Sequence, residues 1–528
     1  MHRFFSILTI ALFLIFLGTP PIITLLTPDR EISKTEKRKF ALLPQLTWSP
    51  KQLEEFPEKF EQYYNDHFGL RDHLAFYQQL FSFKVFKISS SPIVTVGKDE
   101  WLFYNGDRAM LAYLGLTPIS PVFLESYRWT LMDRRDWLAE KEIRYIFLPV
   151  PNKESIYPEF LPRRVRKNAG VSLYDQIISY LKNHPGFSEY LDLKNIFLGK
   201  KKSSRLYLKT DSHWNVNGAF LTYKHIVNKL KEQDIPVRLL RKEEIDWGTV
   251  DYSGDLAMFL NLYKFVTEIA PKMNEVKPYD KHTADLNQTQ QQNKLEFEKF
   301  RHDPRNFVMV QEFSANTTSV LLIHDSFGGF LQPFLAQSFG TVYSVQRGFS
   351  EIKDFIDTVR PDVVIDQRVE RNLLVALALD QSLQKELVKK QFPQSNNIRL
   401  HIDANSGDRE FTSSVGVEVN SMDDGLQIQS EEQYPALVFQ YTSGDGEAPL
   451  MVRIQLSSHQ QTKWLLYYTT EETTNFTPAH TLSMEVKKGY NEYFFRLPDP
   501  GSVGKIQFHP GDAPGEYLLH SFIVKRQE

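Results

Sequence analysis

The sequence predicts an α/β fold: a parallel sheet flanked by helices, with a C-terminal all-β sandwich and an N-terminal membrane helix. Between about residues 110 and 395, apolar β-forming runs alternate with helical patterns, which is typical of a parallel sheet covered on both faces. After about residue 398 the pattern changes to short strands separated by Gly, Asp and Pro turns. A chain of 528 residues is too long for one core, so two or three folded units are expected.

Residues 1–27 carry the predicted membrane helix. The stretch from Phe4 to Leu26 is almost wholly apolar, and as a helix it would reach about 34 Å, enough for a hydrocarbon core of ~30 Å. Pro20 and Pro21 would end the helix early, so a cleaved signal peptide and a buried core helix stay open as alternatives. We favour an uncleaved signal anchor that places Arg3 inside and the rest of the chain outside the cytoplasm.

Residues 28–110 are predicted to form a linker and an N-terminal helical and hairpin segment that packs on the α/β unit. Aromatic residues recur at three- to four-residue steps over 51–90, which indicates helices that meet at Gly69. Two short apolar runs, 93–97 and 101–104, flank the turn residues 98–100 and therefore predict a hairpin.

The α/β unit is expected over 111–397. Its predicted helices lie at 122–141, 172–183 and 216–230, and its predicted strands at 144–150, 188–193, 319–324, 341–345 and 361–365. Residues 272–305 interrupt the pattern and are rich in Lys, Asn, Gln and Glu, so a long surface insertion or mobile lid is expected there.

The sandwich is expected over 398–528. Its predicted strands include 416–419, 437–441, 451–456, 463–468 and 493–497.

Charge and cysteine content exclude several classes of function. The formal net charge of -3 argues against a general nucleic-acid binder, which needs a basic surface. The chain has no cysteine, so cysteine nucleophiles, thiolate metal sites and disulfides are excluded.

Ser326 follows the apolar run 320–323 and is the first candidate nucleophile. A serine at the end of a parallel strand lies at the carboxyl edge of the sheet, where open α/β sheets place their sites. A helix beginning after Ser326 would direct free backbone N–H groups, including that of Phe327, toward an oxyanion. The alternative is that Asp325 and Ser326 only cap this helix.

Asp211 and His213 supply the remaining parts of a nucleophilic site. In an extended segment, residues two apart point to the same side, so Asp211 can orient the imidazole and stabilise the imidazolium. The alternative is a capping segment for the helix that begins near Trp214. A metal set that includes His324 and Asp325 is a further alternative, but the histidines lack metal-site spacing, and we expect neither a metal nor a cofactor.

Two loops add secondary candidates. Gly254 could bring a backbone N–H close to a substrate oxygen, although an ordinary turn explains it equally well. Asn152 and Lys153 follow the strand at 144–150, again at the carboxyl edge, as candidate substrate contacts or solvated loop residues.

Five stretches carry a family resemblance: Tyr64–Arg71, Val96–Phe103, Pro151–Pro158, Lys209–Asn215 and Asp325–Phe327. They resemble the alginate O-acetyltransferase family (AlgJ/AlgX-like), whose catalytic domain is SGNH-hydrolase-like with a permuted order. The resemblance covers about residues 30–375, and the Asp-x-His-Trp segment is its most specific part.

The resemblance implies a triad of Asp211, His213 and Ser326 in a periplasmic, membrane-associated enzyme that acetylates an exopolysaccharide such as alginate. It also implies a membrane-bound O-acyltransferase partner that supplies the acetyl group. The expected reaction is acyl transfer through Ser326, with the oxyanion held by N–H groups after Ser326 and by Gly254. A polysaccharide acetyl esterase with the same triad and a non-catalytic glycan-binding or export scaffold are the alternatives.

The C-terminal sandwich departs from the family pattern. It resembles the β-sandwich segments appended to bacterial glycan-processing enzymes, notably at 464–468 and 508–511. Trp464 and Tyr467 are therefore candidate sugar-stacking residues, although the alternation along this strand places some of its aromatic side chains in the core.

Overall fold

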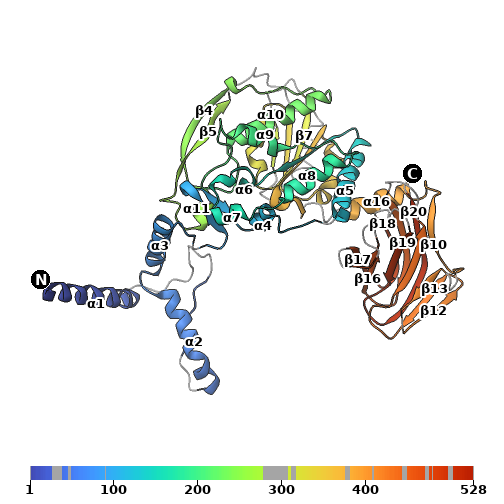
Figure 1. Ribbon diagram of the computed structural model, residues 1–528, viewed down its shortest axis with the longest axis horizontal. Coiled ribbons are helices and arrows are strands. Elements are labelled where there is room, and N and C mark those ends of the chain that lie inside the picture. Colours follow the sequence, from blue (N-terminus) through green and yellow to red (C-terminus); the bar gives the residue numbers. More distant parts are fainter. Residues whose placement is uncertain are drawn as a thin grey trace.

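The computed structural model of the protein contains three parts: N-terminal helices, an α/β unit and a C-terminal β-sandwich (Figure 1). The structure describes residues 2–26, 39–45, 49–89, 91–119, 121–276, 307–310, 317–374, 381–406, 410–414, 416–442, 449–469, 475–477, 480–497 and 503–526. Most of the predicted insertion at 272–305 lies outside these ranges, but its first residues belong to a strand that ends at Val276.

The α/β unit is built on one sheet of strand order β3-β9-β7-β8-β6. The strands are β3 (Arg144–Val150), β6 (Phe307–Val310), β7 (Ser319–Ile323), β8 (Thr341–Val345) and β9 (Val363–Val369). β3, β9, β7 and β8 run parallel, and β6 pairs antiparallel with β8 at the edge. The predicted parallel sheet is thereby confirmed.

Helices cover both faces of this sheet because successive apolar residues point to opposite sides. Even-numbered residues of β3 and β7, such as Ile146 and Leu322, pack with α9 (Leu193–Lys200), α10 (Val216–Glu232) and α13 (Gln332–Leu335). Odd-numbered residues, such as Phe147 and Leu321, pack with α5 (Pro121–Ala139), α8 (Leu173–Asn183) and α14 (Lys353–Val359). Two apolar cores therefore hold the sheet between helix layers.

The carboxyl ends of the parallel strands bring three polar segments to one edge of the sheet. β3 ends just before Asn152, β7 just before the Ser326 segment, and β9 just before Glu370. The unit also contains short helices: α4 (Ala109–Leu114), α6 (Lys153–Ile156), α7 (Arg163–Lys167) and the 3-10 turns η3 (Pro158–Phe160), η5 (Gly328–Phe330), η6 (Ser350–Ile352) and η7 (Glu370–Asn372). The candidate residues of the sequence thus meet where parallel sheets carry their sites.

The N-terminal helices project from the α/β unit on the side opposite the sandwich (Figure 1). They are α1 (His2–Leu26), α2 (Pro50–His67), α3 (Arg71–Phe81) and the π-helix η1 (Ser82–Phe86). Phe4–Thr24 has a mean hydropathy of 2.2 and is long and apolar enough to cross a membrane. Gly69 forms the predicted junction, where its N–H donates to Thr24 Oγ1 at 2.8 Å and a Cβ would collide with the Pro20 carbonyl.

The predicted hairpin at 93–104 is confirmed as β1 (Val94–Val96) and β2 (Leu102–Tyr104), joined by η2 (Lys98–Glu100). The strand predicted at 188–193 is wrong: Tyr190 forms only an isolated bridge with Phe147, and α9 begins at Leu193. A second antiparallel ribbon, β4 (Ile245–Tyr252) with β5 (Glu268–Val276), was not predicted; η4 (Lys242–Glu244) precedes it and α11 (Asp255–Phe259) follows its first strand.

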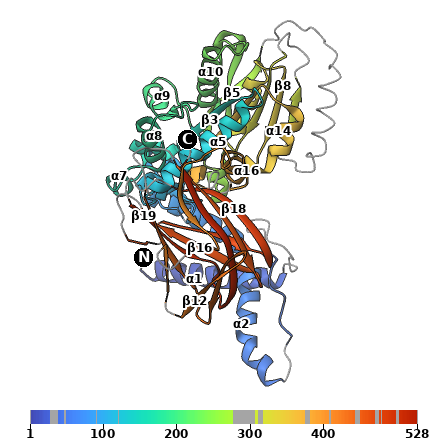
Figure 2. The same cartoon turned by 90° about the vertical axis from the view of Figure 1, so that its right-hand side faces the viewer.

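The C-terminal sandwich consists of two antiparallel sheets (Figure 2). One has the order β12-β13-β20-β15-β18, with β10 also paired to β20, and the other has the order β11-β14-β19-β16-β17. The strands are β10 (Ile398–Ile402), β11 (Phe411–Ser413), β12 (Val417–Met422), β13 (Gly425–Ser430), β14 (Leu437–Thr442), β15 (Leu450–Ser458), β16 (Thr462–Tyr468), β17 (Thr481–Val486), β18 (Gly489–Leu497), β19 (Val503–His509) and β20 (Gly515–Arg526). The predicted sandwich is therefore confirmed.

The sandwich is attached to the α/β unit through α5, α16 (Gln381–Gln391) and β18. The Arg496 guanidinium of β18 pairs with the Asp133 carboxylate of α5 and donates to Gln391 Oε1 at 2.9 Å. Val388 and Phe392 add a small apolar cluster with Met451 and Phe494. Charged and apolar contacts thus join the two units.

Candidate active site

Ser326 lies on the turn that follows β7 and is exposed. Asp325 fixes this turn, because its buried carboxylate accepts four hydrogen bonds, from Phe327 N–H (3.1 Å), Gln367 Nε2 (3.0 Å), Val369 N–H (2.7 Å) and Asn372 Nδ2 (3.2 Å). The strand-end turn therefore presents the Ser326 hydroxyl to solvent from a rigid support.

The predicted helix at Ser326 is only the 3-10 turn η5 followed by the four-residue α13. Such short elements add little helix dipole, since the dipole comes from many aligned peptide units. The Phe327 N–H is bonded to Asp325, so it does not face an oxyanion. Within the described part of the chain, the Ser326 N–H donates to no acceptor, which leaves it free for this task.

His213 connects the nucleophile to a carboxylate. Its Nε2 lies 2.8 Å from Ser326 Oγ, and its Nδ1 lies 2.7 Å from Asp211 Oδ1. Ser326 and His213 are 113 residues apart in sequence, yet the fold places their side chains within hydrogen-bond distance. This relay has the geometry of a nucleophile, a general base and an orienting carboxylate.

Asp211 is held as an anion. Its Oδ2 accepts from the Tyr252 hydroxyl at 2.7 Å and from the Asp255 N–H at 3.0 Å, and its Oδ1 also accepts from the His213 N–H. Burial raises the pKa of Asp211, but the hydrogen bond and charge of His213 and the Tyr252 hydroxyl outweigh burial and hold the pKa well below its usual range. Burial and the Asp211 charge raise the pKa of Tyr252, which therefore stays a donor.

The loop that carries Asp211 and His213 lies between α9 and α10. The alternative role of these residues as a helix cap is not what the structure shows, because Asn215 caps α10 by accepting from the N–H groups of Asn217 and Gly218. The fully buried Trp214 donates its indole N–H to the Phe327 carbonyl at 3.1 Å. This bond ties the histidine loop directly to the serine turn.

Lys153 does not face the substrate side as the sequence suggested. Its side chain is buried, and its Nζ donates to the carbonyls of Asp211 (2.5 Å), Leu208 (3.1 Å) and Lys209 (3.4 Å). Burial lowers the pKa of Lys153 to about 8. Lys153 therefore supports the loop of Asp211 from beneath.

Gly254 also differs from its predicted role. Its N–H donates to Thr210 Oγ1 at 3.0 Å, so it is not available to an oxyanion. A Cβ at this position would lie 2.3 Å from the Asp211 Cβ. A glycine is needed here because the chain after β4 approaches Asp211 too closely for any side chain.

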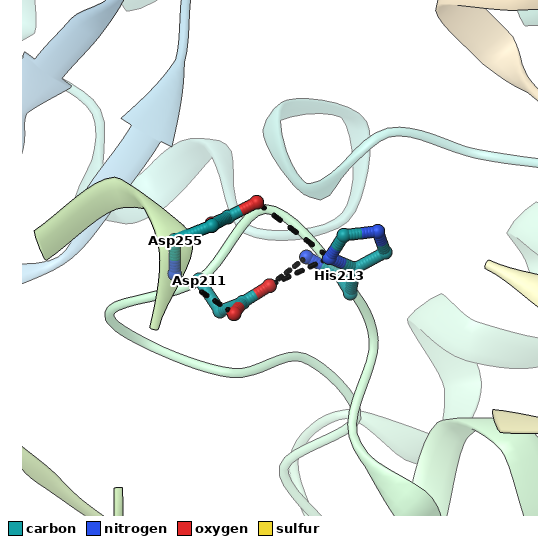
Figure 3. A group of neighbouring side chains, drawn as sticks. All are labelled: Asp211, His213 and Asp255. Carbon is teal, nitrogen blue, oxygen red and sulfur yellow. Dashed lines mark hydrogen bonds and ion pairs between the residues drawn. The ribbon is translucent and has the colours of Figure 1, made fainter. Parts of the chain in front are cut away.

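Asp255 is a second carboxylate beside the imidazole (Figure 3). Its Oδ2 lies 3.7 Å from His213 Nδ1 and accepts from Ser212 Oγ at 2.5 Å. Among the described residues, Asp211, His213 and Asp255 form the one group with metal-ligand spacing. Each of the three ligand atoms already has a hydrogen-bond partner, so the arrangement is accounted for without an ion. His324, from the alternative metal set, is buried and bonded to Ser344 Oγ.

Asn152 remains at the site edge. Its N–H donates to the buried Glu370 carboxylate at 2.8 Å, and its Oδ1 accepts from Arg371 at 3.3 Å. Its Nδ2 is buried and has no hydrogen-bond partner among the described residues. The Arg371 guanidinium lies 5.4 Å from the centroid of the Phe327 ring, which also packs on His213. Asn152 and Arg371 therefore adjoin the serine turn.

The two predicted sugar-stacking residues lie on β16. Trp464 is fully buried in the sandwich core, so its indole offers no face to a sugar. The alternation along β16 places Tyr467 half-buried on the opposite side, with its ring 5.6 Å from His509.

Tyr252, Asp255, Arg371 and Glu370 were missed as functional residues by sequence reasoning. Tyr252 and Asp255 flank Gly254 in a segment that the sequence singled out only for its glycine. Glu370 and Arg371 directly follow β9, and the same strand-end rule that selected Ser326 and Asn152 could have selected them.

Part of the chain is similar to known proteins. Residues 94–298 match the family model of the SGNH hydrolase-like domain of the acetyltransferase AlgX. "Probable alginate O-acetylase AlgJ" of Pseudomonas syringae pv. tomato is 24% identical over 221 residues, which are 41% of this chain and 54% of that protein. The protein of the same name from Pseudomonas putida is 25% identical over 193 residues, which are 36% and 47% of the two chains.

The chain thus spans about half the length of the curated relatives it matches. Among solved structures, the O-acetyltransferase domain of Pseudomonas putida AlgJ is 19% identical and covers 53% of this chain and 91% of that chain, with a TM-score of 0.34. The chain carries an SGNH hydrolase-like domain of the acetyltransferase AlgX type and is a distant homologue of the AlgJ proteins.

Proposed function

We propose that this protein O-acetylates an extracytoplasmic polysaccharide through an acetyl-enzyme on Ser326. The observation that carries the proposal is the position of His213, which lies within hydrogen-bond distance of both an exposed serine hydroxyl and a buried carboxylate. The match to the AlgX-type acetyltransferase domain supports acetyl transfer as the chemistry.

In the first half-reaction, His213 Nε2 takes the proton of Ser326 Oγ while the oxygen attacks the acetyl carbonyl carbon. The Asp211 carboxylate stabilises the imidazolium that forms. The bond between the acetyl carbon and the donor's leaving oxygen then breaks, and that oxygen takes the proton from His213. Acetyl-Ser326 and the free donor alcohol or acid are the products of this half-reaction.

In the second half-reaction, a sugar hydroxyl gives its proton to His213 Nε2 and attacks the acetyl-serine carbonyl. The bond to Ser326 Oγ breaks, and Oγ recovers the proton. The negative oxygen of both tetrahedral intermediates is stabilised by the Ser326 N–H and the Asn152 amide, with Arg371 alongside. These donors replace the N–H groups of Gly254 and Phe327, which are bonded elsewhere.

The apolar helix α1 supports an extracytoplasmic setting, because it is long and apolar enough to cross a membrane. In the proposed setting α1 is an uncleaved anchor in the inner membrane, the α/β unit lies in the periplasm, and a membrane-bound O-acyltransferase supplies the acetyl group. Alginate is the substrate suggested by the names of the AlgJ relatives, and it is one candidate polymer in exopolysaccharide biosynthesis.

The test is to incubate the purified chain with an acetyl donor ester and an oligosaccharide acceptor, and to measure acetylated sugar and free acetate together. We expect acetyl-sugar from the native chain and neither product from Ser326→Ala. Free acetate alone, with every acceptor, would show that the triad works as an esterase. Full activity in Ser326→Ala would refute Ser326 as the nucleophile, and absence of both products with the native chain would favour a glycan-binding scaffold.

A further inference from the structure

The outer face of one sandwich sheet carries a row of side chains that are polar or aromatic, apart from Leu518 at its centre. The pairing of β12, β13, β20, β15 and β18 aligns Asn420, Gln427, Leu518, Ser457 and Tyr490 across the sheet. Residues directly opposite in antiparallel strands project to the same side. All five side chains are half-buried or exposed, whereas their strand neighbours Ile428 and Tyr517 are buried in the core.

A cavity of about 320 Å³ opens on this face, where the β12–β13 and β15–β16 turns meet the first residues of β18. Its lining includes Asp424, Gln427, His459, Lys488, Glu516 and Leu518. This volume falls at the lower end of the roughly 300–1,000 Å³ typical of small-ligand sites. The lining combines apolar surface with hydrogen-bond donors and acceptors, which suits a sugar ring with its apolar C–H face and its hydroxyl groups.

Several side chains of this region are already held in place. The Tyr490 hydroxyl accepts from Gln455 Nε2 at 2.6 Å, and its ring, 58% exposed, lies 5.5 Å from the His520 ring. His520 in turn bonds to Ser457 Oγ and to the Asp424 carbonyl, both at 2.8 Å. Tyr490 directly follows Gly489 of the cavity lining, and an aromatic ring that is already held in place costs little conformational entropy on binding. It is the arrangement that stacks on sugars.

The charge of the cavity restricts the kind of sugar. Two carboxylates, those of Asp424 and Glu516, and one ammonium group, that of Lys488, line the cavity, and the His459 imidazole lies 3.9 Å from Glu516. A uronate would bring another carboxylate into a region where negative charge already predominates. Neutral or N-acetylated sugars avoid this repulsion.

We propose that the cavity beside Tyr490 binds a neutral sugar unit of the polysaccharide and holds the polymer for the triad. This inference rests on the proposed function. It adds the class of acceptor polysaccharide, which is a neutral glycan and not a polyuronate. Tyr490 stacks on the sugar, and the side chains around the cavity bond its hydroxyls.

The first test measures binding to the detergent-solubilised full chain carrying Ser326→Ala, so that no acetyl transfer occurs. The probes are neutral hexasaccharides of glucose, mannose, galactose and N-acetylglucosamine, and a hexamer of mannuronate. We expect at least one neutral hexasaccharide to bind about tenfold more tightly than the uronate. Absence of binding by every neutral probe, or tighter binding of the uronate, would overturn the proposal.

The second test locates the site. Tyr490→Ala should weaken the neutral glycan by roughly 5- to 10-fold. The matched control Tyr434→Ala, at another exposed tyrosine of the sandwich, should leave binding unchanged. The double substitution Asp424→Asn with Glu516→Gln should improve binding of the mannuronate hexamer. Equal affinities for Tyr490→Ala and the parent chain would refute this location.

The two proposals fail separately. The cavity variants are predicted to turn over a small acetyl ester at the native rate, because the cavity lies in the sandwich and the triad in the α/β unit. Lost glycan binding with intact ester turnover supports the cavity. Intact glycan binding in Tyr490→Ala refutes the cavity and leaves the triad in place, whereas lack of ester turnover in the native chain refutes the triad alone.

Discussion

Asp211 is the residue on which the orientation of His213 depends. Replacing it with asparagine keeps the shape but removes the charge and permits the wrong imidazole tautomer. We expect Asp211→Asn to lower kcat for a small acetyl ester by about 10³- to 10⁴-fold. Tyr252→Phe removes only one donor to Asp211 and should cost about tenfold. A loss of less than tenfold in Asp211→Asn would mean that the carboxylate does not serve His213.

Lys153 acts on the reaction through the loop that it supports. Lys153→Met keeps the length of the side chain but removes the donor to three carbonyls, including that of Asp211. Because displacements of about 1 Å can cost 10²-fold in rate, we expect kcat to fall by about 10- to 100-fold with little change in KM. The control Lys201→Met removes another lysine bonded to a backbone carbonyl and should keep full activity. Equal kcat in the two variants would contradict this role.

Glu154 links stability to pH. Burial raises its pKa to about 7, so the folded chain keeps a proton that the unfolded chain loses above about pH 4.3. Its contribution to stability is fully present below this pH and is lost as the pH rises to about 7. We expect this loss to be on the order of 3 kcal/mol.

Denaturant unfolding at pH 5 and pH 7.5 measures the effect. Glu154→Gln should reduce the difference in unfolding free energy between the two pH values. Lys153 does not contribute to the difference in unfolding free energy between these two pH values, because its lowered pKa, about 8, affects stability only above this range. Parallel pH profiles for the two chains would show that Glu154 is not the titrating group.

At the scale of elements, the histidine loop and the serine turn depend on one indole hydrogen bond. Trp214→Phe preserves most of the packing but leaves the Phe327 carbonyl without its donor, at a cost of about 1–3 kcal/mol. We expect kcat to fall by about tenfold as Ser326 and His213 move apart. Trp247→Phe is the matched control, since Trp247 also donates to a backbone carbonyl but lies on β4. Similar losses in the two variants would argue for a general packing effect.

The sheet could be predicted from the sequence because β3 and β7 are largely apolar runs buried on both faces. The β4–β5 ribbon could not, because Ile245–Tyr252 contains two aspartates and a glycine and Glu268–Val276 contains a proline. These strands are held by pairing with each other and not by periodic burial. The sequence of such a ribbon therefore shows little alternation of apolar and polar residues from which its strands could be predicted.

The same contrast holds at the site. Ser326, His213 and Asp211 could be predicted because strand ends and two-residue spacing have geometric meaning along the chain. The Lys153 ammonium group and the Gly254 backbone N–H each bond to a loop that is distant in sequence. Their roles therefore do not follow from the local sequence. Only the folded structure shows that Gly254 N–H is bonded to Thr210 and that Lys153 points beneath Asp211.

At the scale of the whole molecule, the pair of Arg496 and Asp133 joins the sandwich to the α/β unit. Both side chains are buried, and breaking such a pair typically costs about 3–5 kcal/mol. We expect Arg496→Ala to expose the segment around α16 to limited proteolysis while leaving turnover of a small acetyl ester within about twofold, since the triad lies in the other unit.

Lys390→Ala is the matched control at the same junction. Lys390 of α16 pairs with Glu140 near the end of α5, but both side chains are more than half exposed, so the pair contributes little. We expect no change in its proteolysis. Unchanged proteolysis in Arg496→Ala as well would mean that the apolar contacts alone hold the two units together.

The chemistry of the whole molecule depends on one covalent intermediate. The most direct measurement is peptide mass spectrometry of the full chain after brief incubation with a small acetyl ester and an acid quench. We expect one acetyl group on the peptide that contains Ser326, strongly reduced in His213→Ala and absent in Ser326→Ala. Turnover of the ester with an acetyl group on another residue, or with the peptide of Ser326 never modified, would contradict this expectation.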